Sequence, residues 1–312
     1  KIGKVEGKLY GRKPGAHMGF LDRFFKSGGS ESEAKKQDIF ARFDIVRASI
    51  SGTMSNFHMA KDRKTHDVFG LKLIDMEKHH AFESRFKGLN KPEEGEVALK
   101  MSHPHIVKTI EYGVAPNKQK YILMEYLDGI GLNQAIINKD PLLDGNRMRI
   151  IRMMAEALAH VHKQGFIHRD VCPRNYICSS DRTSVKLIDF GLTIPATPPF
   201  MAPGNRTGTP RYMAPEIIRR RPTDQRVDLF ALGVSIYELC TGELPWPSSE
   251  ISGKVALEHD TVKPRPILDV APNLDPTLAN AIMKAIEADP AKRQESVDHF
   301  LRMIRNLPED LF

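Results

Sequence analysis

Three polar residues are spaced so that they could act on a single ligand. Asp170 is followed five residues later by Asn175, and Asp189 comes directly after the strand-like segment at 185–188. A carboxylate can accept the proton of a hydroxyl group, and carboxylate and amide oxygens are the ligands that Mg²⁺ prefers. The short spacing between Asp170 and Asn175 lets one loop present both groups. Phosphoryl transfer from a nucleotide requires this combination.

The segments around these residues follow one another in a recognisable order. They are HRDVCPRN at 168–175, DFG at 189–191 and MAPE at 213–216. Each segment alone is a weak signal, but the ordered set resembles the eukaryotic-type (Hanks-type) Ser/Thr protein kinase catalytic domain, from about residue 40 to 306. The compact loops at 61–67 and after Glu243 favour a bacterial member of that family.

The resemblance implies an α+β fold with two lobes. We expect a small lobe of five β-strands and one helix, a larger, mainly α-helical lobe, and an ATP site between them. The predicted division is a basic, flexible tail at 1–39, the small lobe at 40–127 and the large lobe at 128–312. The implied activity is transfer of the γ-phosphoryl group of ATP to Ser/Thr hydroxyls of protein substrates, with autophosphorylation and a role in signalling.

The resemblance also assigns roles to individual residues. Asp170 corresponds to the catalytic base, and Asn175 and Asp189 correspond to the Mg²⁺ ligands. Lys72, in VFGLKL at 68–73, corresponds to the lysine that binds the α- and β-phosphates. Its expected ion-pair partner is Glu94, which lies ten residues before Pro104 of an HPHIV segment. Glu93 and Glu96 are the alternative partners.

Adenine is expected to bind at the segment MEYL at 124–127. Backbone groups of Glu125 and Leu127 would pair with the base, and Met124 would limit the back of the pocket. The phosphate-binding loop corresponds to ISGTMSNF at 50–57, in which only Gly52 of the three usual glycines remains. Glycine lets backbone N–H groups approach a phosphate closely, so this loop departs from the family pattern.

Two other positions depart from the family. Gly70 replaces the usual alanine, which removes a methyl group that would touch adenine. Cys172 stands where Ser/Thr kinases carry a lysine for the γ-phosphate, and Arg174, two residues later, is expected to supply the positive charge instead, as in tyrosine kinases. These departures leave open a second interpretation, a pseudokinase that binds nucleotide or protein without turnover.

The segment GTPRYMAPE at 208–216 resembles the substrate loop of Ser/Thr kinases. Thr209 lies where that class uses a threonine to contact the catalytic Asp. Arg169, the arginine beside the catalytic Asp, is typical of kinases in which this loop becomes ordered when a phosphate on it pairs with that arginine. Thr207 is the first candidate for the phosphorylated residue. A small-molecule kinase of related fold is a third interpretation, but such enzymes often lack the Ala-Pro-Glu segment.

The remaining pattern predicts the elements that position these residues. A helix is expected at 91–101, capped by Asn90, and Gly165 is expected to end the helix that begins at Arg147. The helix at 227–239 is apolar nearly all round and should be central to the large lobe. Expected strands are 43–50, 57–60, 68–74, 106–112 and 121–125, and expected helices are 91–101, 147–164, 227–239, 276–288 and 296–306.

Composition narrows the class of protein. Of the net charge of +7, five units lie in residues 1–36, so the folded remainder is too weakly basic for a nucleic-acid-binding protein. No segment has the roughly 18 consecutive apolar residues of a membrane span. The spacing of the three cysteines matches no zinc or CxxC pattern, which favours a reduced, cytoplasmic protein. The apolar segment Phe20–Phe25 is either incidental or a peripheral membrane contact, and the oligomeric state is left open.

Overall fold

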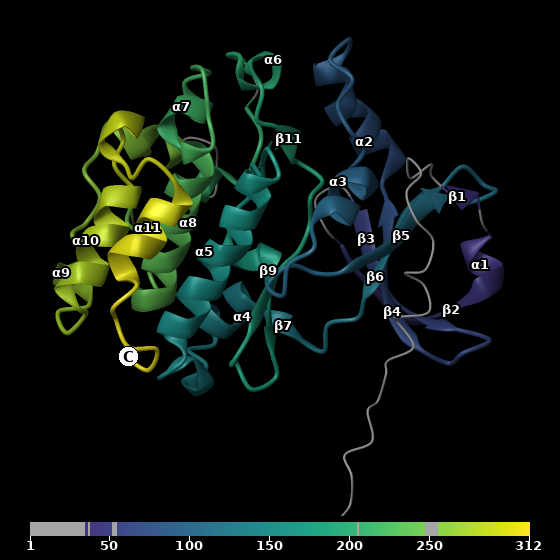
Figure 1. The fold of residues 1–312 in the computed structure, drawn as a ribbon, viewed down its shortest axis with the longest axis horizontal. Coiled ribbons are helices and arrows are strands. Elements are labelled where there is room, and N and C mark those ends of the chain that lie inside the picture. The colour runs from purple at the N-terminus through teal and green to yellow at the C-terminus, as the bar shows by residue number, and fades with distance from the viewer. Residues whose placement is uncertain (1–34, 37, 52–54, 205, 247–254) are drawn as a thin grey trace, which may run out of the picture. The chain divides into compact units, whose positions relative to one another are not determined.

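The structure is a computed structural model. It describes residues 35, 36, 38–51, 55–204, 206–246 and 255–312 (Figure 1). The apolar segment Phe20–Phe25, most of the predicted tail and Gly52 of the expected phosphate-binding loop lie outside the described residues. The predicted division of the chain at 39 and 127 stays a prediction.

The first half of the described chain forms one sheet with the strand order β1-β5-β6-β4-β3-β2. The five predicted strands are present and pair antiparallel, and the two-residue strand β1 adds a parallel partner at the edge. In the register of β4 and β6, Gly70 lies opposite Met124 and Lys72 opposite Ile122. The strands are β1 Lys35–Lys36, β2 Phe43–Ser51, β3 Ser55–Asp62, β4 Val68–Ile74, β5 Thr109–Val114 and β6 Lys120–Glu125.

One predicted strand begins later than expected. The pattern placed a strand at 106–112, but β5 starts at Thr109, and Ile106 instead forms an isolated bridge with Leu187. The amide of Val107 donates to the carbonyl oxygen of Leu187 at 3.0 Å. The apolar residues at 106 and 107 are therefore buried against β10 (Val185–Leu187), and their hydrophobic pattern reflects that contact.

The prediction of a single helix in this half is wrong. Besides α3 (Glu94–Lys100), the chain forms α1 (Ile39–Arg42) and α2 (Met76–Glu83). Phe82 is the one buried residue of α2, so its sequence has no apolar stripe to reveal it. The predicted start of α3 is also wrong, because Asn90 has φ of 48° and cannot cap a helix that begins four residues later.

The second half of the described chain is mainly helical, as predicted. The helix α5 (Arg147–Lys163) ends before Gly165, whose φ is 82°, and Gly242, with φ of 74°, ends α8 (Arg226–Thr241). The side chain of Ser296 caps α11 by accepting a hydrogen bond from the amide of His299. The other helices are α4 Leu132–Ile137, α6 Pro198–Met201, α7 Pro215–Ile218, α9 Ile267–Val270, α10 Pro276–Ala285 and α11 Val297–Ile304.

Short strands and 3-10 turns connect these helices. Three strands form a small sheet in the order β10-β9-β7, and β8 pairs with β11. The strands are β7 Gly129–Gly131, β8 Phe166–Ile167, β9 Tyr176–Ser179, β10 Val185–Leu187 and β11 Ile194–Pro195. The 3-10 turns used below are η2 Ser84–Phe86, η4 Pro173–Asn175, η5 Pro210–Tyr212 and η6 Val255–Asp260.

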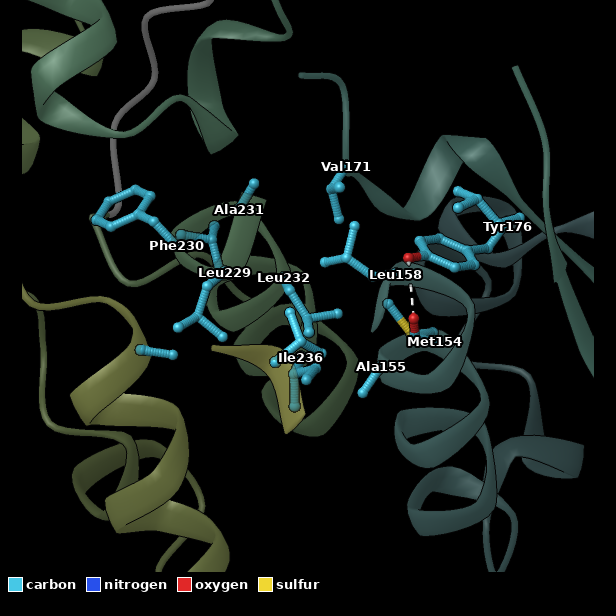
Figure 2. Packing of buried hydrophobic residues seen from close by; sticks show 14 of the residues in the cluster. Met154, Ala155, Leu158, Val171, Tyr176, Leu229, Phe230, Ala231, Leu232 and Ile236 are labelled. Atoms are coloured by element: carbon cyan, nitrogen blue, oxygen red, sulfur yellow. Dashed lines mark hydrogen bonds between the residues drawn. The ribbon is translucent and has the colours of Figure 1, made fainter. Parts of the chain in front are cut away.

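The helix α8 lies at the centre of the main core, as its all-round apolar sequence predicted. Its buried residues run continuously from Val227 to Tyr237. Figure 2 shows Leu232 and Ile236 facing Leu158 and Ala155 of α5. No helix among the described residues is both long and apolar enough to cross a membrane.

Candidate active site

A buried carboxylate of α8 holds the backbone of the loop at 168–175. Asp228 accepts hydrogen bonds from the amides of His168 at 2.7 Å and Arg169 at 2.8 Å, and from the ring of His162 at 2.9 Å. Burial would raise the pKa of Asp228, but these donors and the neighbouring histidines lower it on balance. Because Asp228 sits on the central helix, the loop is tied directly to the core.

This loop brings Asp170 and Asn175 together, as their spacing predicted. Nδ2 of Asn175 donates to Oδ2 of Asp170 at 2.9 Å and to its carbonyl oxygen at 2.7 Å. The other carboxylate oxygen, Oδ1, accepts from the amide of Thr209 at 3.0 Å and from its hydroxyl at 2.6 Å. The carboxylate of Asp170 is thus oriented from two sides, by the loop itself and by the segment that resembles a substrate loop.

Cys172 and Arg174 differ in exposure and in charge. Cys172 is 1 % exposed, and burial raises the pKa of its thiol to about 12, so it carries no charge at neutral pH. The side chain of Arg174 is 53 % exposed, and its Nη2 lies 3.2 Å from Oγ1 of Thr209 and 3.6 Å from Oδ2 of Asp170. Of these two residues, Arg174 is the one that brings a positive charge close to Asp170, and its predicted role at the γ-phosphate stays a prediction.

Lys72 is brought to two of the predicted acidic residues. Its Nζ donates to Oε1 of Glu94 and, at 2.8 Å, to Oδ1 of Asp189. Burial would lower the pKa of Lys72, but the two carboxylates raise it on balance, so the amine stays protonated. The two alternative partners of Lys72 form other ion pairs, Glu93 with Lys120 and Glu96 with Lys100.

A close approach of α3 to β5 sets the position of Glu94. Gly95 follows Glu94, and a Cβ atom added to Gly95 would lie 2.3 Å from Cγ of Tyr112. Real side chains do not approach so closely, so only glycine allows the helix to rest on this residue of β5. Sequence reasoning missed this contact, although a glycine inside a helix next to a functional residue is a signal that could have revealed it.

The donor set around Asp189 and Asn175 suits a hard cation. Asp189 has φ of 68°, and its Oδ1 accepts hydrogen bonds from Nζ of Lys72 and from the amide of Gly191. No described residue donates a hydrogen bond to Oδ2 of Asp189 or to Oδ1 of Asn175. Two oxygens are therefore available to Mg²⁺. The described residues include no group of three or more His, Cys, Asp or Glu arranged for a metal.

The predicted adenine-binding segment, 124–127, begins with the last two residues of β6. Oε1 of Glu125 accepts hydrogen bonds from the amide of Lys108 at 2.8 Å and from Lys186 of β10, which fixes the segment from two sides. Leu127 is partly buried against the cluster that contains Met124. A Cβ atom on Gly70 would lie 2.9 Å from Cγ of Met124, so the missing methyl group makes room for this side chain.

Comparison with known proteins agrees with this geometry. Residues 50–303 match the protein kinase domain. The chain belongs to the protein kinase family. It is 34 % identical over 217 residues to serine/threonine-protein kinase pkn3 of Myxococcus xanthus, which covers 66 % of this chain and 40 % of that protein.

Two further relatives cover more of this kinase domain. Serine/threonine-protein kinase PknB of Mycolicibacterium smegmatis is 32 % identical, over 83 % of this chain and 42 % of that protein. Serine/threonine-protein kinase PrkC of Bacillus subtilis is 28 % identical, over 83 % of this chain and 39 % of that protein. The chain thus spans about two fifths of the length of these relatives.

The kinase activation segment, here the residues between the DFG and MAPE segments, passes close to Arg169. Arg169 has φ of 72°, and its guanidinium contacts the hydroxyl of Thr207 at 3.5 Å and that of Thr223 at 3.3 Å. Thr207 is 8 % exposed, so its hydroxyl faces inward. The expected phosphorylation site and the expected phosphate-binding arginine are therefore adjacent.

The same segment contains a short helix that contacts both halves of the kinase domain. The amide of Thr223 donates to the carbonyl oxygen of Met201, at the end of α6, at 3.0 Å. The ring of Phe200, also in α6, lies 5.7 Å from the ring of Phe86 in η2, which follows α2. Sequence reasoning missed this bridge, because neither phenylalanine lies in a motif.

A buried ion pair connects two helical segments of the large lobe. Glu216 and Arg293 form a buried bidentate ion pair, with distances of 2.7 and 2.9 Å, which joins α7 to the segment after α10.

In the expected phosphate-binding loop, the described part includes the register pair Ile50 and Phe57 of β2 and β3. The role predicted for Gly52 stays a prediction, since this residue lies outside the described part of the chain.

Proposed function

We propose that this chain transfers the γ-phosphoryl group of ATP to Ser or Thr hydroxyls of protein substrates, including its own. The observation that carries the proposal is the environment of Asp170. Its carboxylate is oriented by Asn175 and Thr209, with Arg174 3.6 Å away. The names of the relatives, which are serine/threonine-protein kinases, support the same reaction.

In the proposed reaction, Asp170 accepts the proton of the substrate hydroxyl. The oxygen of that hydroxyl forms a bond to the γ-phosphorus at the same time. The bond from that phosphorus to the bridging oxygen of ADP breaks, and ADP leaves with the bonding electron pair. Lys72, held by Glu94, would bind the α- and β-phosphates, and Arg174 would face the transferred group.

Asn175 and Asp189 would hold Mg²⁺ through their available oxygens, and the bound ion would offset the negative charge of the phosphates. The backbone groups of Glu125 and Leu127 would bind adenine. Gly52 would approach the phosphates through its amide. A preference for Ser/Thr over Tyr is supported by the 2.6 Å hydrogen bond from the Thr209 hydroxyl to Asp170.

The decisive experiment is incubation of the chain with labelled ATP and Mg²⁺, followed by mapping of phosphorylated residues by mass spectrometry. We expect phosphoserine or phosphothreonine on the wild-type chain and none on the Asp170→Asn variant. The Asp189→Ala variant should lose the Mg²⁺-dependent part of its ATP affinity, which can be measured without turnover. ATP binding with no phosphorylation of the chain or of added protein would instead identify a pseudokinase.

We further propose that phosphorylation of Thr207 raises the activity. A phosphate on this residue would lie beside the guanidinium of Arg169, which already contacts its hydroxyl. Because Thr207 is buried, its modification requires the segment to open first. The test compares the activity of three forms: the Thr207→Ala variant, autophosphorylated wild type and phosphatase-treated wild type. Equal activity of all three forms would contradict this proposal.

A further inference from the structure

A histidine outside the predicted site contacts the segment that would receive the protein substrate. Nδ1 of His259, in η6, lies 2.8 Å from the carbonyl oxygen of Met213. The acceptor is a carbonyl, so the ring must carry its proton on Nδ1. Met213 follows directly after η5, the turn that begins one residue after Thr209. His259 and Asp170 therefore hold the two ends of the same five-residue segment, 209–213.

The ring of His259 is fixed by its neighbours. It is 2 % exposed, and it packs against Trp246, with ring centroids 4.4 Å apart, and against Phe230 of α8, at 5.6 Å. The indole N–H of Trp246 in turn donates to the carbonyl oxygen of Val262 at 2.9 Å. Trp246 and Phe230 also stack on each other, with ring centroids 5.9 Å apart. A donor packed against both rings keeps its direction, so it fixes the position of the Met213 carbonyl oxygen.

The residue next to His259 makes a second contact with the same region. Asp260 accepts two hydrogen bonds from the guanidinium of Arg219, at 2.8 and 3.0 Å. Arg219 follows α7, and Met213 precedes it. The turn η6 therefore holds both ends of α7, through His259 on the side of Met213 and through Asp260 on the side of Arg219.

Inside the segment 209–213, internal hydrogen bonds transmit this position to the other end. The amide of Tyr212 donates to the carbonyl oxygen of Thr209 at 2.9 Å, and the amide of Met213 to that of Pro210 at 3.3 Å. The hydroxyl of Tyr212 donates to Glu238 of α8 at 2.6 Å. A shift of Met213 would therefore move Thr209, whose hydroxyl orients the carboxylate of Asp170.

We propose that His259 is a positioning residue for the protein substrate, which sets the segment 209–213 against Asp170 through its hydrogen bond to Met213. The proposal rests on the proposed kinase function, in which this segment receives the substrate. It predicts that His259 governs the KM for the protein substrate and leaves the KM for ATP unchanged, because none of its contacts involves a predicted ATP-binding residue.

Two substitutions separate the hydrogen bond from the ring packing. His259→Phe keeps an aromatic ring packed against Trp246 and Phe230 but removes the donor. His259→Asn loses the ring but carries an N–H close to the position of Nδ1. His80→Asn, at an exposed position of α2, is the matched control. Each variant would be assayed with dephosphorylated casein as acceptor at saturating ATP, and with ATP varied at saturating casein.

We expect His259→Phe to raise the KM for casein by about 3- to 10-fold, the factor that one neutral hydrogen bond is typically worth. His259→Asn should stay closer to wild type, and the KM for ATP should not change in either variant. An unchanged KM for casein in His259→Phe, or an equal rise in both variants, would overturn the proposal.

A second measurement keeps the proposal testable if wild type phosphorylates no acceptor or if His259→Phe does not fold. Amide hydrogen exchange at residues 209–216 should be faster in Arg219→Ala, which loses the outer contact of η6, and in His259→Phe where it folds. Exchange equal to wild type would reject the positioning role. Absence of any wild-type turnover would reject the kinase proposal while leaving this result valid.

Discussion

The two sides of the candidate site are built in different ways. On the large-lobe side, Asp170 is held by directional hydrogen bonds from Asn175 and Thr209, and its loop is fixed to α8 through Asp228. On the small-lobe side, Glu94 reaches Lys72 from a seven-residue helix. One side derives its geometry from hydrogen bonds to the core, and the other from how a short helix packs on a sheet.

The supporting helices explain this contrast. Every residue of α8 from Val227 to Tyr237 is buried, whereas α3 buries four residues and ends after two turns. Short helices gain little stability by themselves, so the position of α3 depends on its tertiary contacts. We infer that the large-lobe side is set once the core has formed, whereas the position of Glu94 depends on the contacts of α3 with the sheet.

The largest effect is expected on the large-lobe side. Asp170→Asn retains the shape of the side chain but removes the base, so kcat should fall by about 10²- to 10⁴-fold while ATP binding and stability stay close to wild type. Steady-state kinetics, calorimetric titration of ATP and urea unfolding would measure the three quantities. A loss of ATP affinity as large as the loss of kcat would show that Asp170 shapes the nucleotide site instead.

A pair of glycines tests the contrast between α3 and α8. Gly95→Ala should favour helix formation by about 1 kcal/mol, but the new Cβ would lie 2.3 Å from Tyr112 and push α3 off β5. Glu94 would then leave Lys72. We expect kcat/KM for ATP to fall about tenfold with little change in the free energy of unfolding.

Gly233→Ala, in α8, is the matched variant. Its new Cβ would lie 2.8 Å from Cβ of Ala285 and from Cγ2 of Ile286, inside the core. The same gain in helix propensity applies here, but overpacking inside the core costs about 1–3 kcal/mol of unfolding free energy and outweighs it, while the activity of the folded fraction should be retained. If both substitutions lowered activity and stability in the same proportion, the two helices would not differ in the way described.

The motifs made most of the large-lobe side predictable. The spacing of Asp170, Asn175 and Asp189 was enough to indicate the chemistry, and the apolar sequence of α8 indicated a central helix. Local signals suffice when neighbouring residues in the sequence share one loop or when a helix is buried all round. The choice of Glu94 over its neighbours followed from the family resemblance, through its spacing to Pro104.

The features that the sequence did not reveal are contacts between distant segments. The packing of Gly95 on Tyr112, the Phe86–Phe200 ring contact and the hydrogen bond from His259 to Met213 each join residues from different elements. Periodicity describes one element at a time and cannot pair two of them. The helix α2 was missed for a related reason, because Phe82 alone of its residues is buried and no repeating apolar pattern exists.

A smaller effect is expected where α6 connects the two sides. Phe200→Ala removes the ring that packs on Phe86 but leaves the hydrogen bond between Met201 and Thr223. The contact is remote from the chemistry, so we expect kcat to fall about threefold, within the range of one aromatic pair. Phe40→Ala, at an exposed position of α1, is the control. Equal kinetics of the two variants would show that α6 is held by the large lobe alone.

The smallest effect concerns pH and the place where the two sides meet. His103 and His105 follow α3, and the ring of His160 in α5 lies 5.1 Å from that of His103. Burial lowers the pKa of all three histidines, and only His105 has a carboxylate close by, Glu156 at 3.3 Å. The charges of Lys163 near His160 and Lys186 near His105 lower these pKa values further.

The sign of the effect follows from the protonation of the two states. A histidine whose pKa is lower in the folded state is protonated first in the unfolded chain, so folding is most favourable above the unfolded pKa of about 6.5. The free energy of unfolding should therefore decrease as the pH falls below 6.5. His160→Gln removes one of the three groups, so its free energy of unfolding should decrease less than that of wild type over the same interval. Urea unfolding at pH 7.5, 6.5 and 5.5 gives the slope for each protein, and the same slope for His160→Gln and wild type would mean that this cluster does not respond to pH.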